Sequence, residues 1–172
     1  MQRHTDERLV LEVIKNHGEF KDRLRILNLT SDFGILDAAV VSVVKSWFAL
    51  AKQHGEELKS LDLTRQPRAV YSRAYYAAYN ASKAVRYLSR GIVSSGGDDH
   101  RKVSDLPDSF PDVNAWARDL QAMYEHRLRA DYDNWTMTPS EHILTPGDCA
   151  ALAQRFIAVC EHFLNDVYKV QV

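Results

Sequence analysis

The spacing of apolar residues is the feature that most constrains the fold of this 172-residue chain. Apolar residues recur three and four positions apart along nearly the whole sequence, which is the period of an α-helix. No stretch shows the clean alternation of apolar and polar residues that a half-buried strand requires. The length suits one domain with a hydrophobic core. The sequence therefore predicts a single all-α domain over residues 1–172, an up-and-down bundle of about five helices with one long loop.

Breaks in the apolar pattern place the first three helices. The first is expected over about residues 6–28, and the second from about residue 35, with a buried first half and an exposed second half. Pro67 fits a first helical turn and Gly91 fits a helix end, so the third helix is expected at about Pro67–Arg90. The residues of the first two helices expected to point inward are Val10, Val13, Ile14, Phe20, Leu24 and Leu27, then Ile35, Leu36, Ala39, Val40, Val43, Val44, Trp47, Phe48 and Leu50.

The second half of the chain contains a long connection and two more helices. Residues 92–113 hold two glycines and two prolines with little periodicity, so we expect a loop there that is mobile at residues 94–99. Thr145 followed by Pro146 and Asp148 predicts the start of the last helix, with a capping box between Thr145 and Asp148. The inward residues expected in the fourth and last helices are Val113, Trp116, Leu120, Met123, Tyr124 and Leu128, then Leu152, Phe156, Val159, Cys160, Phe163 and Val167.

The charge balance argues against several classes of protein. Lys and Arg number 22 and Asp and Glu 23, a net charge of -1, so no global field draws the chain to nucleic acid or to an anionic membrane. An RNA or phosphate partner must therefore be bound by a local patch. The N-terminal residues mix acids and bases, and the most apolar run, residues 35–51, is interrupted by polar and charged residues. We expect no signal peptide, no membrane span and a cytoplasmic location.

Cysteines and histidines give no sign of a disulfide, metal or cofactor site. If Cys149 and Cys160 both lie on the last helix, they are roughly 16 Å apart at the helical rise per residue, too far for a disulfide. The seven histidines are scattered and do not have the spacing of a metal motif. We therefore expect neither a metal nor a cofactor.

A polar strip runs along the third helix, which is otherwise apolar. Steps of three and four residues place Arg73, Tyr76, Asn80 and Lys83 on one face. Buried charges persist only when they are paired, so this strip must face solvent, a partner chain or an internal carboxylate. Two interpretations follow. In the first, Arg73 is a structural arginine, and Asp131 is the first choice of partner. In the second, the strip lines a nucleotide or RNA site.

A second group of candidate residues lies at the end of the fourth helix. His126, Arg127 and Arg129 form a cationic cluster near a helix C-terminus, where the helix dipole favours positive charge. Ion pairs spaced four residues apart would account for part of this pattern without any function. Cleavage of RNA needs a group that titrates near neutral pH beside a cation that stabilises the phosphorane oxygens. His126 or His100 could supply the first of these, and Arg127 or Arg129 the second.

Three segments in this order resemble the HEPN domains of prokaryotes. They are SRAYYAAYNASKA at residues 72–84, HRKV at 100–103 and RADYD at 129–133, and the resemblance covers about residues 35–168, preceded by an N-terminal helix. It implies a homodimeric helical bundle of a toxin–antitoxin or defence system, often encoded beside a minimal nucleotidyltransferase. Many HEPN proteins are metal-independent ribonucleases with an Arg-x4–6-His motif in a cleft across the dimer. The residues assigned on this basis are His126, Arg127 and Arg129 for catalysis, and Arg73, Tyr76, Asn80, Lys83, His100, Asp131 and Tyr132 for binding; a tyrosine near the position of Tyr132 is a modification acceptor in some relatives.

The sequence departs from the family pattern at the catalytic motif. Neither Arg127 nor Arg129 is followed by a histidine at the family's spacing, and Asn80 stands where relatives commonly carry histidine. The only literal match, Arg155 with His162, lies on the last helix, outside the family's motif positions. The leading hypothesis is an RNA- or nucleotide-binding protein that is a candidate ribonuclease. The alternatives are a non-catalytic interaction module that dimerises and binds a protein such as a minimal nucleotidyltransferase, and a structural bundle with an Arg73–Asp131 pair and no ligand.

Overall fold

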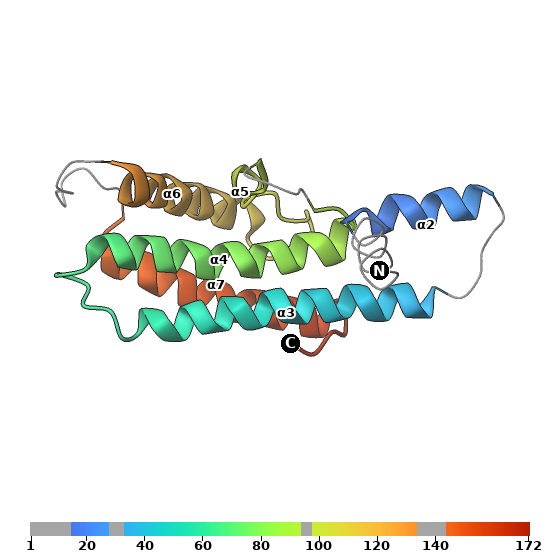
Figure 1. Cartoon of the computed structure of the whole chain (residues 1–172), viewed down its shortest axis with the longest axis horizontal. Coiled ribbons are helices and arrows are strands. Elements are labelled where there is room, and N and C mark those ends of the chain that lie inside the picture. The colour runs from blue at the N-terminus through green and yellow to red at the C-terminus, as the bar shows by residue number, and fades with distance from the viewer. Residues whose placement is uncertain (1–14, 28–32, 94–97, 134–143) are drawn as a thin grey trace, which may run out of the picture.

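The computed structural model describes residues 15–27, 33–93, 98–133 and 144–172, and these residues form an elongated helical bundle (Figure 1). Apart from one isolated bridge between Asn16 and Ile92, the described part of the chain contains no β-structure. The prediction of an all-α chain is therefore confirmed. The described helices are α2 (His17–Ile26), α3 (Gly34–Leu58), α4 (Pro67–Arg90), α5 (Asp98–Arg101), α6 (Val113–Tyr132) and α7 (Pro146–Asp166).

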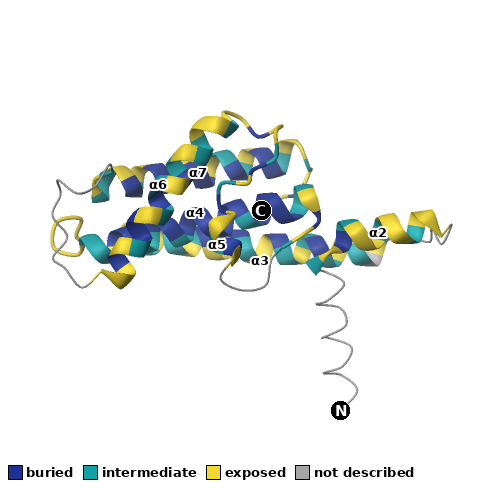
Figure 2. Ribbon diagram, turned by 90° about the horizontal axis from the view of Figure 1, so that it is seen from above, coloured by how far each residue is buried: buried dark blue, intermediate teal, exposed yellow. Residues whose placement is uncertain are grey.

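Helix α4 is the central element of the bundle. It packs against α3, α6 and α7, and most of its surface is buried (Figure 2). Five alanines between residues 74 and 84 are completely buried, and such small side chains let neighbouring helices approach closely. Helices α3 and α6 lie on either side of α4 (Figure 1) and hardly contact each other. The face of α4 between them is therefore only partly covered.

The helix ends follow the sequence signals. Pro67 occupies the first turn of α4, and Gly91 ends the helix with a φ of 70°, a left-handed conformation that favours glycine. At the start of α7, the Thr145 side chain accepts a hydrogen bond from the Asp148 N–H, and the Asp148 carboxylate accepts from the Thr145 N–H. The predicted bounds of α4 and the predicted capping box are both confirmed.

The sequence predicted an exposed second half of α3, and this prediction is wrong. Ala51, Gly55 and Leu58 are buried, because this half packs against α7. The Gly55 carbonyl accepts a 2.7 Å hydrogen bond from the Gln154 side chain, and a Cβ at Gly55 would lie only 3.0 Å from Ile157 Cδ1. A glycine in a polar stretch therefore marks close helix packing here. The exposed polar residues around Gly55 lie on the face of α3 that points away from the bundle.

The long connection after α4 is more ordered than predicted. It contains the short helix α5, and Asp99, Val103, Leu106 and Phe110 are buried against the bundle. The predicted mobility concerned residues 94–99; residues 94–97 lie outside the described residues, and 98 and 99 belong to α5. No periodic pattern marks this segment in the sequence, because its buried side chains are spaced irregularly along an irregular backbone.

The N-terminal helix packs less than its apolar pattern suggested. Phe20 and Leu27 are 36% and 64% exposed, so the prediction that both point inward is wrong. The first turn of α2 docks where the Gly18 N–H bonds to the Gly91 carbonyl, and Lys21 of α2 pairs with Asp37 of α3. The C-terminal end of α2 extends past α4 (Figure 1). Two further residues expected inside are also exposed, Leu50 and Val167. The predicted inward residues Val10, Val13 and Ile14 lie outside the described residues.

Two further sequence expectations concern membranes and cysteines. Within the described residues, no helix is long and apolar enough to cross a membrane. Cys149 and Cys160 both lie on α7, and both are buried free thiols. The expectation that both cysteines lie on the last helix is confirmed.

Candidate functional site

Aromatic side chains gather where α4 meets α5 and α6. Tyr75 lies at the centre, with ring centroids 5.6 Å from Tyr76, 5.9 Å from Tyr79 and 5.7 Å from Tyr124. The spacing of Tyr75, Tyr76 and Tyr79 along α4 places their rings toward α5 and α6. Tyr75 and Tyr79 are buried, whereas Tyr76 and Tyr124 are half-buried. We call these four residues the tyrosine cluster.

Arg127 of α6 is held against the tyrosine cluster. Its Nη2 donates a 2.7 Å hydrogen bond to the Tyr76 hydroxyl, and its guanidinium carbon lies 5.3 Å from the ring centroids of both Tyr76 and Tyr132. Its Nε lies 2.7 Å from Asp131 Oδ2. The hydrogen bond to Tyr76 and the charge of Asp131 raise the pKa of Arg127 although burial opposes this. Arg127 is therefore a fixed cation beside a half-buried tyrosine.

The predicted pair between Arg73 and Asp131 does not form. Asp131 pairs instead with Arg127, which lies one turn earlier on the same helix and so is nearer than any residue of α4. Tyr132 follows Asp131 at the end of α6 and is 67% exposed, and its ring lies against the Arg127 guanidinium on the solvent side of the site. The structure thus brings together three of the predicted residues of α6, Arg127, Asp131 and Tyr132.

His100 of α5 also joins the tyrosine cluster. Its ring stacks on Tyr79 at a centroid distance of 4.2 Å and lies 5.9 Å from the Tyr76 ring. Its Nδ1 lies 3.0 Å from the Tyr75 hydroxyl. Burial lowers the pKa of His100, and the nearby positive charge of Arg127 lowers it further. At neutral pH His100 is therefore an uncharged imidazole that can accept a proton. Of the imidazoles and cations considered from sequence, the structure brings together His100 and Arg127.

His126 and Arg129 lie away from this group. The His126 ring is 2% exposed, stacks on Tyr71 at 5.2 Å and accepts a hydrogen bond from the Leu144 N–H at 3.2 Å. The predicted compact cluster is therefore wrong for His126, because consecutive residues of a helix point about 100° apart and His126 faces the core. Arg129 is exposed on another side of α6. Neither side chain shares the contacts that Arg127 makes with the tyrosine cluster.

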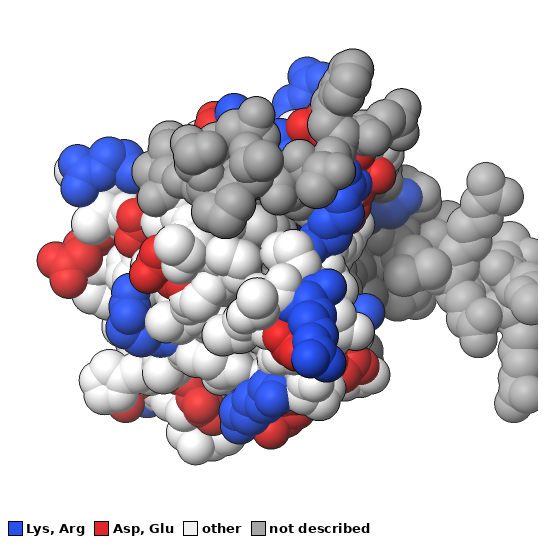
Figure 3. Space-filling model, turned by 90° about the vertical axis from the view of Figure 1, so that its left-hand side faces the viewer, with Lys and Arg blue, Asp and Glu red and all other residues white. Residues whose placement is uncertain are grey.

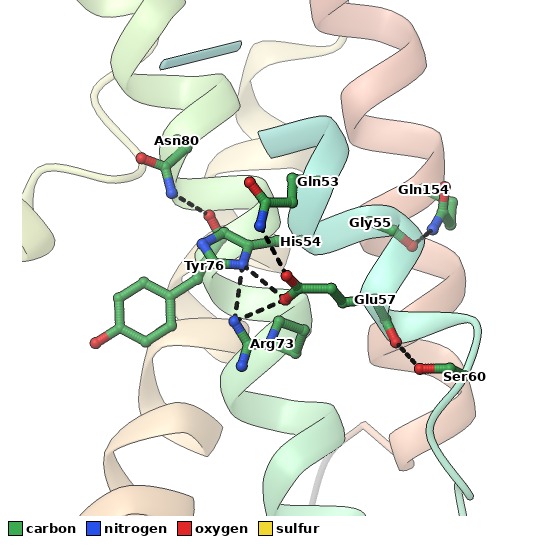
Figure 4. A network of polar contacts seen from close by, with 9 residues as sticks. All are labelled: Gln53, His54, Gly55, Glu57, Ser60, Arg73, Tyr76, Asn80 and Gln154. Carbon is green, nitrogen blue, oxygen red and sulfur yellow. Dashed lines mark hydrogen bonds and ion pairs between the residues drawn. The ribbon is translucent and has the colours of Figure 1, made fainter. Parts of the chain in front are cut away.

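Arg73 pairs with α3 rather than with α6. Its Nη1 lies 2.9 Å from Glu57 Oε2 and 2.9 Å from His54 Nδ1 (Figure 4). Glu57 also accepts a hydrogen bond from Gln53, at 2.9 Å. The His54 ring lies 6.0 Å from the Tyr76 ring. Tyr76 thus has an imidazole from α3 and another from α5 near its ring.

The rest of the predicted strip contributes less to this site. Asn80 is buried, and its amide donates to the Tyr76 carbonyl at 2.8 Å, so it serves the local backbone (Figure 4). Lys83 Nζ lies 4.5 Å from the Trp47 ring and 5.6 Å from the Tyr79 ring. Burial lowers the pKa of Lys83, while the charge of Asp99 opposes this. Lys83 places a partly desolvated cation on the α3 side of the strip.

Arg155 and His162, which match the family motif by spacing, do not lie at the candidate site. His162 pairs with Asp166 at 2.9 Å, and its side chain is 81% exposed on α7. Arg155 lies exposed two turns earlier on the same helix. This match is a coincidence of spacing, because neither residue contacts the tyrosine cluster.

Two pairs of residues around the site were not predicted from the sequence. His54 and Glu57 lie three residues apart on α3, on the side that faces α4, and this spacing was the only sequence signal for them. Arg86 and Asp99 form a buried ion pair, and the Tyr79 hydroxyl donates to Asp99 Oδ2 at 2.7 Å. Arg86 lies on α4 and Asp99 on α5, so no spacing within one helix could have indicated this pair.

At one end of the bundle, the described surface carries both basic and acidic side chains. Figure 3 shows that end, where basic and acidic side chains are intermingled. Among the described residues, no three His, Cys, Asp or Glu side chains lie close enough together to hold a metal ion. The chemistry that the described site offers is that of imidazole, guanidinium and phenol groups.

Comparisons with known proteins give no relative. No protein-family model, no curated protein and no solved structure matches this chain.

Proposed function

We propose that this protein is a HEPN-type RNA-binding protein of a toxin–antitoxin or defence system that cleaves RNA without a metal ion at the tyrosine cluster. The observation that carries the proposal is the approach of His100 and Arg127 to one half-buried ring, that of Tyr76. An imidazole that is neutral at physiological pH can take a proton from an attacking hydroxyl. A fixed guanidinium stabilises the charge that develops on the phosphorane oxygens.

The aromatic side chains supply the binding surface in this proposal. Bases of single-stranded RNA stack on aromatic rings without regard to sequence, and nearby cations hold the backbone. Tyr76, Tyr124 and Tyr132 each leave part of their rings accessible. In a homodimer of the kind that the resemblance implies, two such surfaces would face one cleft. Because the net charge is -1, we expect weak binding with a modest dependence on salt.

The test is cleavage of a labelled single-stranded RNA by purified protein in EDTA. Wild type should cut, and His100→Asn and Arg127→Lys should each lose most of the rate while keeping the wild-type circular dichroism spectrum. His162→Gln is the control, because that imidazole is exposed on α7. Absence of binding and of cleavage in wild type, or equal rates in all four proteins, would contradict the proposal.

A non-catalytic interaction module is the second candidate, and one observation favours it. Arg73 and Arg127 are each already neutralised by a carboxylate, Glu57 and Asp131 respectively. Such pairs weaken the attraction for phosphate and suit a surface that docks on another protein. This candidate predicts a stable complex with a minimal nucleotidyltransferase in co-expression, and no cleavage of RNA by the chain alone.

A further inference from the structure

We infer that the Asp131 carboxylate occupies the position at which the site binds a phosphate group of RNA, and that RNA displaces this carboxylate from Arg127. The inference rests on the proposed function. The Arg127 side chain is only 10% exposed, so a ligand gains full contact with it only by displacing a group that covers it. The Asp131 side chain is more exposed, at 26%, and it carries the negative charge that a phosphate would replace.

The contact between Arg127 and Asp131 is close but incomplete. Asp131 Oδ2 lies 2.7 Å from Arg127 Nε, yet the buried Nε makes no hydrogen bond, so its N–H is not aligned with the carboxylate. A buried donor without an acceptor is costly, and a phosphate oxygen in line with this N–H would remove the cost. Hydrogen bonds between guanidinium and phosphate are also among the stronger ones in proteins. The ion pair therefore neutralises charge but leaves a donor for an incoming ligand.

The Tyr76 hydroxyl offers a second donor beside the same guanidinium. It accepts a 2.7 Å hydrogen bond from Arg127 Nη2, and its own proton has no acceptor among the described residues. A phosphate has several acceptor oxygens, so it can bind the Arg127 and Tyr76 donors together. The pair of donors therefore suits a phosphate better than it suits the carboxylate of Asp131.

The aromatic ring on the solvent side of Arg127 can hold a base next to this phosphate. The Arg127 guanidinium carbon lies 5.3 Å from the ring centroid of Tyr132, and Tyr132 is 67% exposed. A base that stacks on the open part of this ring adds binding energy that a free phosphate ion lacks. This energy offsets the cost of separating Asp131 from Arg127. We therefore expect single-stranded RNA to occupy the position and inorganic phosphate to bind far more weakly.

Exchange of one anion for another also determines how binding depends on salt. A phosphate of single-stranded RNA that is neutralised by a protein cation releases about 0.7 of a counterion. In wild type, the displaced Asp131 carboxylate takes up a cation from solution, so the contact with Arg127 adds little to the salt slope. Asp131→Asn removes this compensation, and its slope should be steeper by about 0.7.

The experiment measures the fluorescence anisotropy of a labelled single-stranded RNA that is methylated at every 2′-oxygen and so cannot be cleaved. Asp131→Asn should bind it about fivefold more tightly than wild type, with the steeper salt slope. The control Asp166→Asn removes the same charge from α7, where the carboxylate pairs with the exposed His162, and should bind like wild type. The circular dichroism spectra of both variants should match that of wild type.

Nuclear magnetic resonance reports the exchange directly at Arg127. The Arg127 Nε–H signal of wild type, identified by its absence from the spectrum of Arg127→Lys, should move downfield when the same RNA is added. The reason is that this N–H then gains a hydrogen-bond acceptor. Inorganic phosphate at the same concentration should leave the signal in place.

The outcomes separate this inference from the proposed function. RNA binding by wild type that Asp131→Asn does not strengthen would overturn the inference and leave the proposed RNA-binding site intact. RNA binding that leaves the Arg127 Nε–H signal unchanged would have the same consequence. If neither wild type nor Asp131→Asn binds RNA, both proposals are overturned together.

Discussion

Arg86 of α4 and Asp99 of α5 form an ion pair of 3.0 Å whose side chains are only 5% and 1% exposed. The pair fastens the connection after α4 to the bundle, next to the histidine at position 100. The salt bridge with Arg86 lowers the pKa of Asp99 although burial acts in the opposite direction. The position of His100 in the candidate site therefore depends on a buried charge pair.

Removing one partner of this pair should be costly. Asp99→Asn leaves the Arg86 charge buried without its counterion, and we expect a loss of about 3–5 kcal/mol in the free energy of unfolding, measured with urea. Asp22→Asn is the matched control, because its partner Arg25 is exposed. Equal urea midpoints for Asp99→Asn and wild type would show that the pair does not anchor α5.

Stability should fall below neutral pH because of His17. Its Nε2 donates to the Tyr87 carbonyl at 3.1 Å, its Nδ1 is buried without a hydrogen bond, and burial lowers its pKa. The unfolded chain then binds a proton more readily, so the contribution of His17 is complete above about pH 6.5 and is lost as the pH falls through the lowered folded value.

The measurement is urea unfolding between pH 7.5 and 5. His17→Phe keeps an aromatic ring against Tyr87 and should flatten the profile. His100 also has a lowered pKa and should leave a residual slope. A variant profile as steep as that of wild type would rule out His17 as the source.

Substitution of Arg73 should change stability little. Its side chain and that of Glu57 are 41% and 39% exposed, and exposed pairs contribute little to folding. Arg73→Met should therefore shift the urea midpoint by a small fraction of the shift for Asp99→Asn. A loss as large as that of Asp99→Asn would mean that Arg73 is structural after all.

A homodimer is expected from the resemblance and from the exposed aromatic edge of the site. Sedimentation equilibrium at micromolar concentration should give twice the chain mass of 19.7 kDa. Tyr132→Asp should shift the equilibrium toward monomer by placing a charge on that edge, whereas Val167→Asp, at the exposed residue just after α7, should not. A monomer throughout the concentration range would remove the model of a shared cleft.

Cleavage of RNA should persist in EDTA. The proposed reaction uses only groups of the chain, so chelation removes nothing that it requires. Rates with EDTA and with added Mg²⁺ should agree within about twofold, with His100→Asn as the inactive control. Loss of activity in EDTA that Mg²⁺ restores would contradict the proposed chemistry.

The helices and several of their ends could be predicted from the amino-acid sequence alone. These features are local, because each depends on residues only a few positions apart. They are the period of the apolar residues, Pro67, Gly91 and the Thr145–Asp148 capping box. Sequence also identified Arg73, Tyr76, Asn80 and Lys83 as one strip of α4, because helical geometry fixes which residues share a face. Helical geometry does not determine which neighbouring element the strip faces, and Asp131 was therefore assigned to the wrong arginine.

Which residues contact one another across helices became clear from the three-dimensional packing alone. His126 and Arg127 are neighbours in sequence, yet the first faces Tyr71 and the core and the second faces Tyr76. His54 and His100 lie on separate helices and approach one ring only because α3 and α5 both pack beside α4. The physical reason is that an ion pair or a shared site depends on the relative placement of helices, which the packing of the whole core sets and no local spacing encodes.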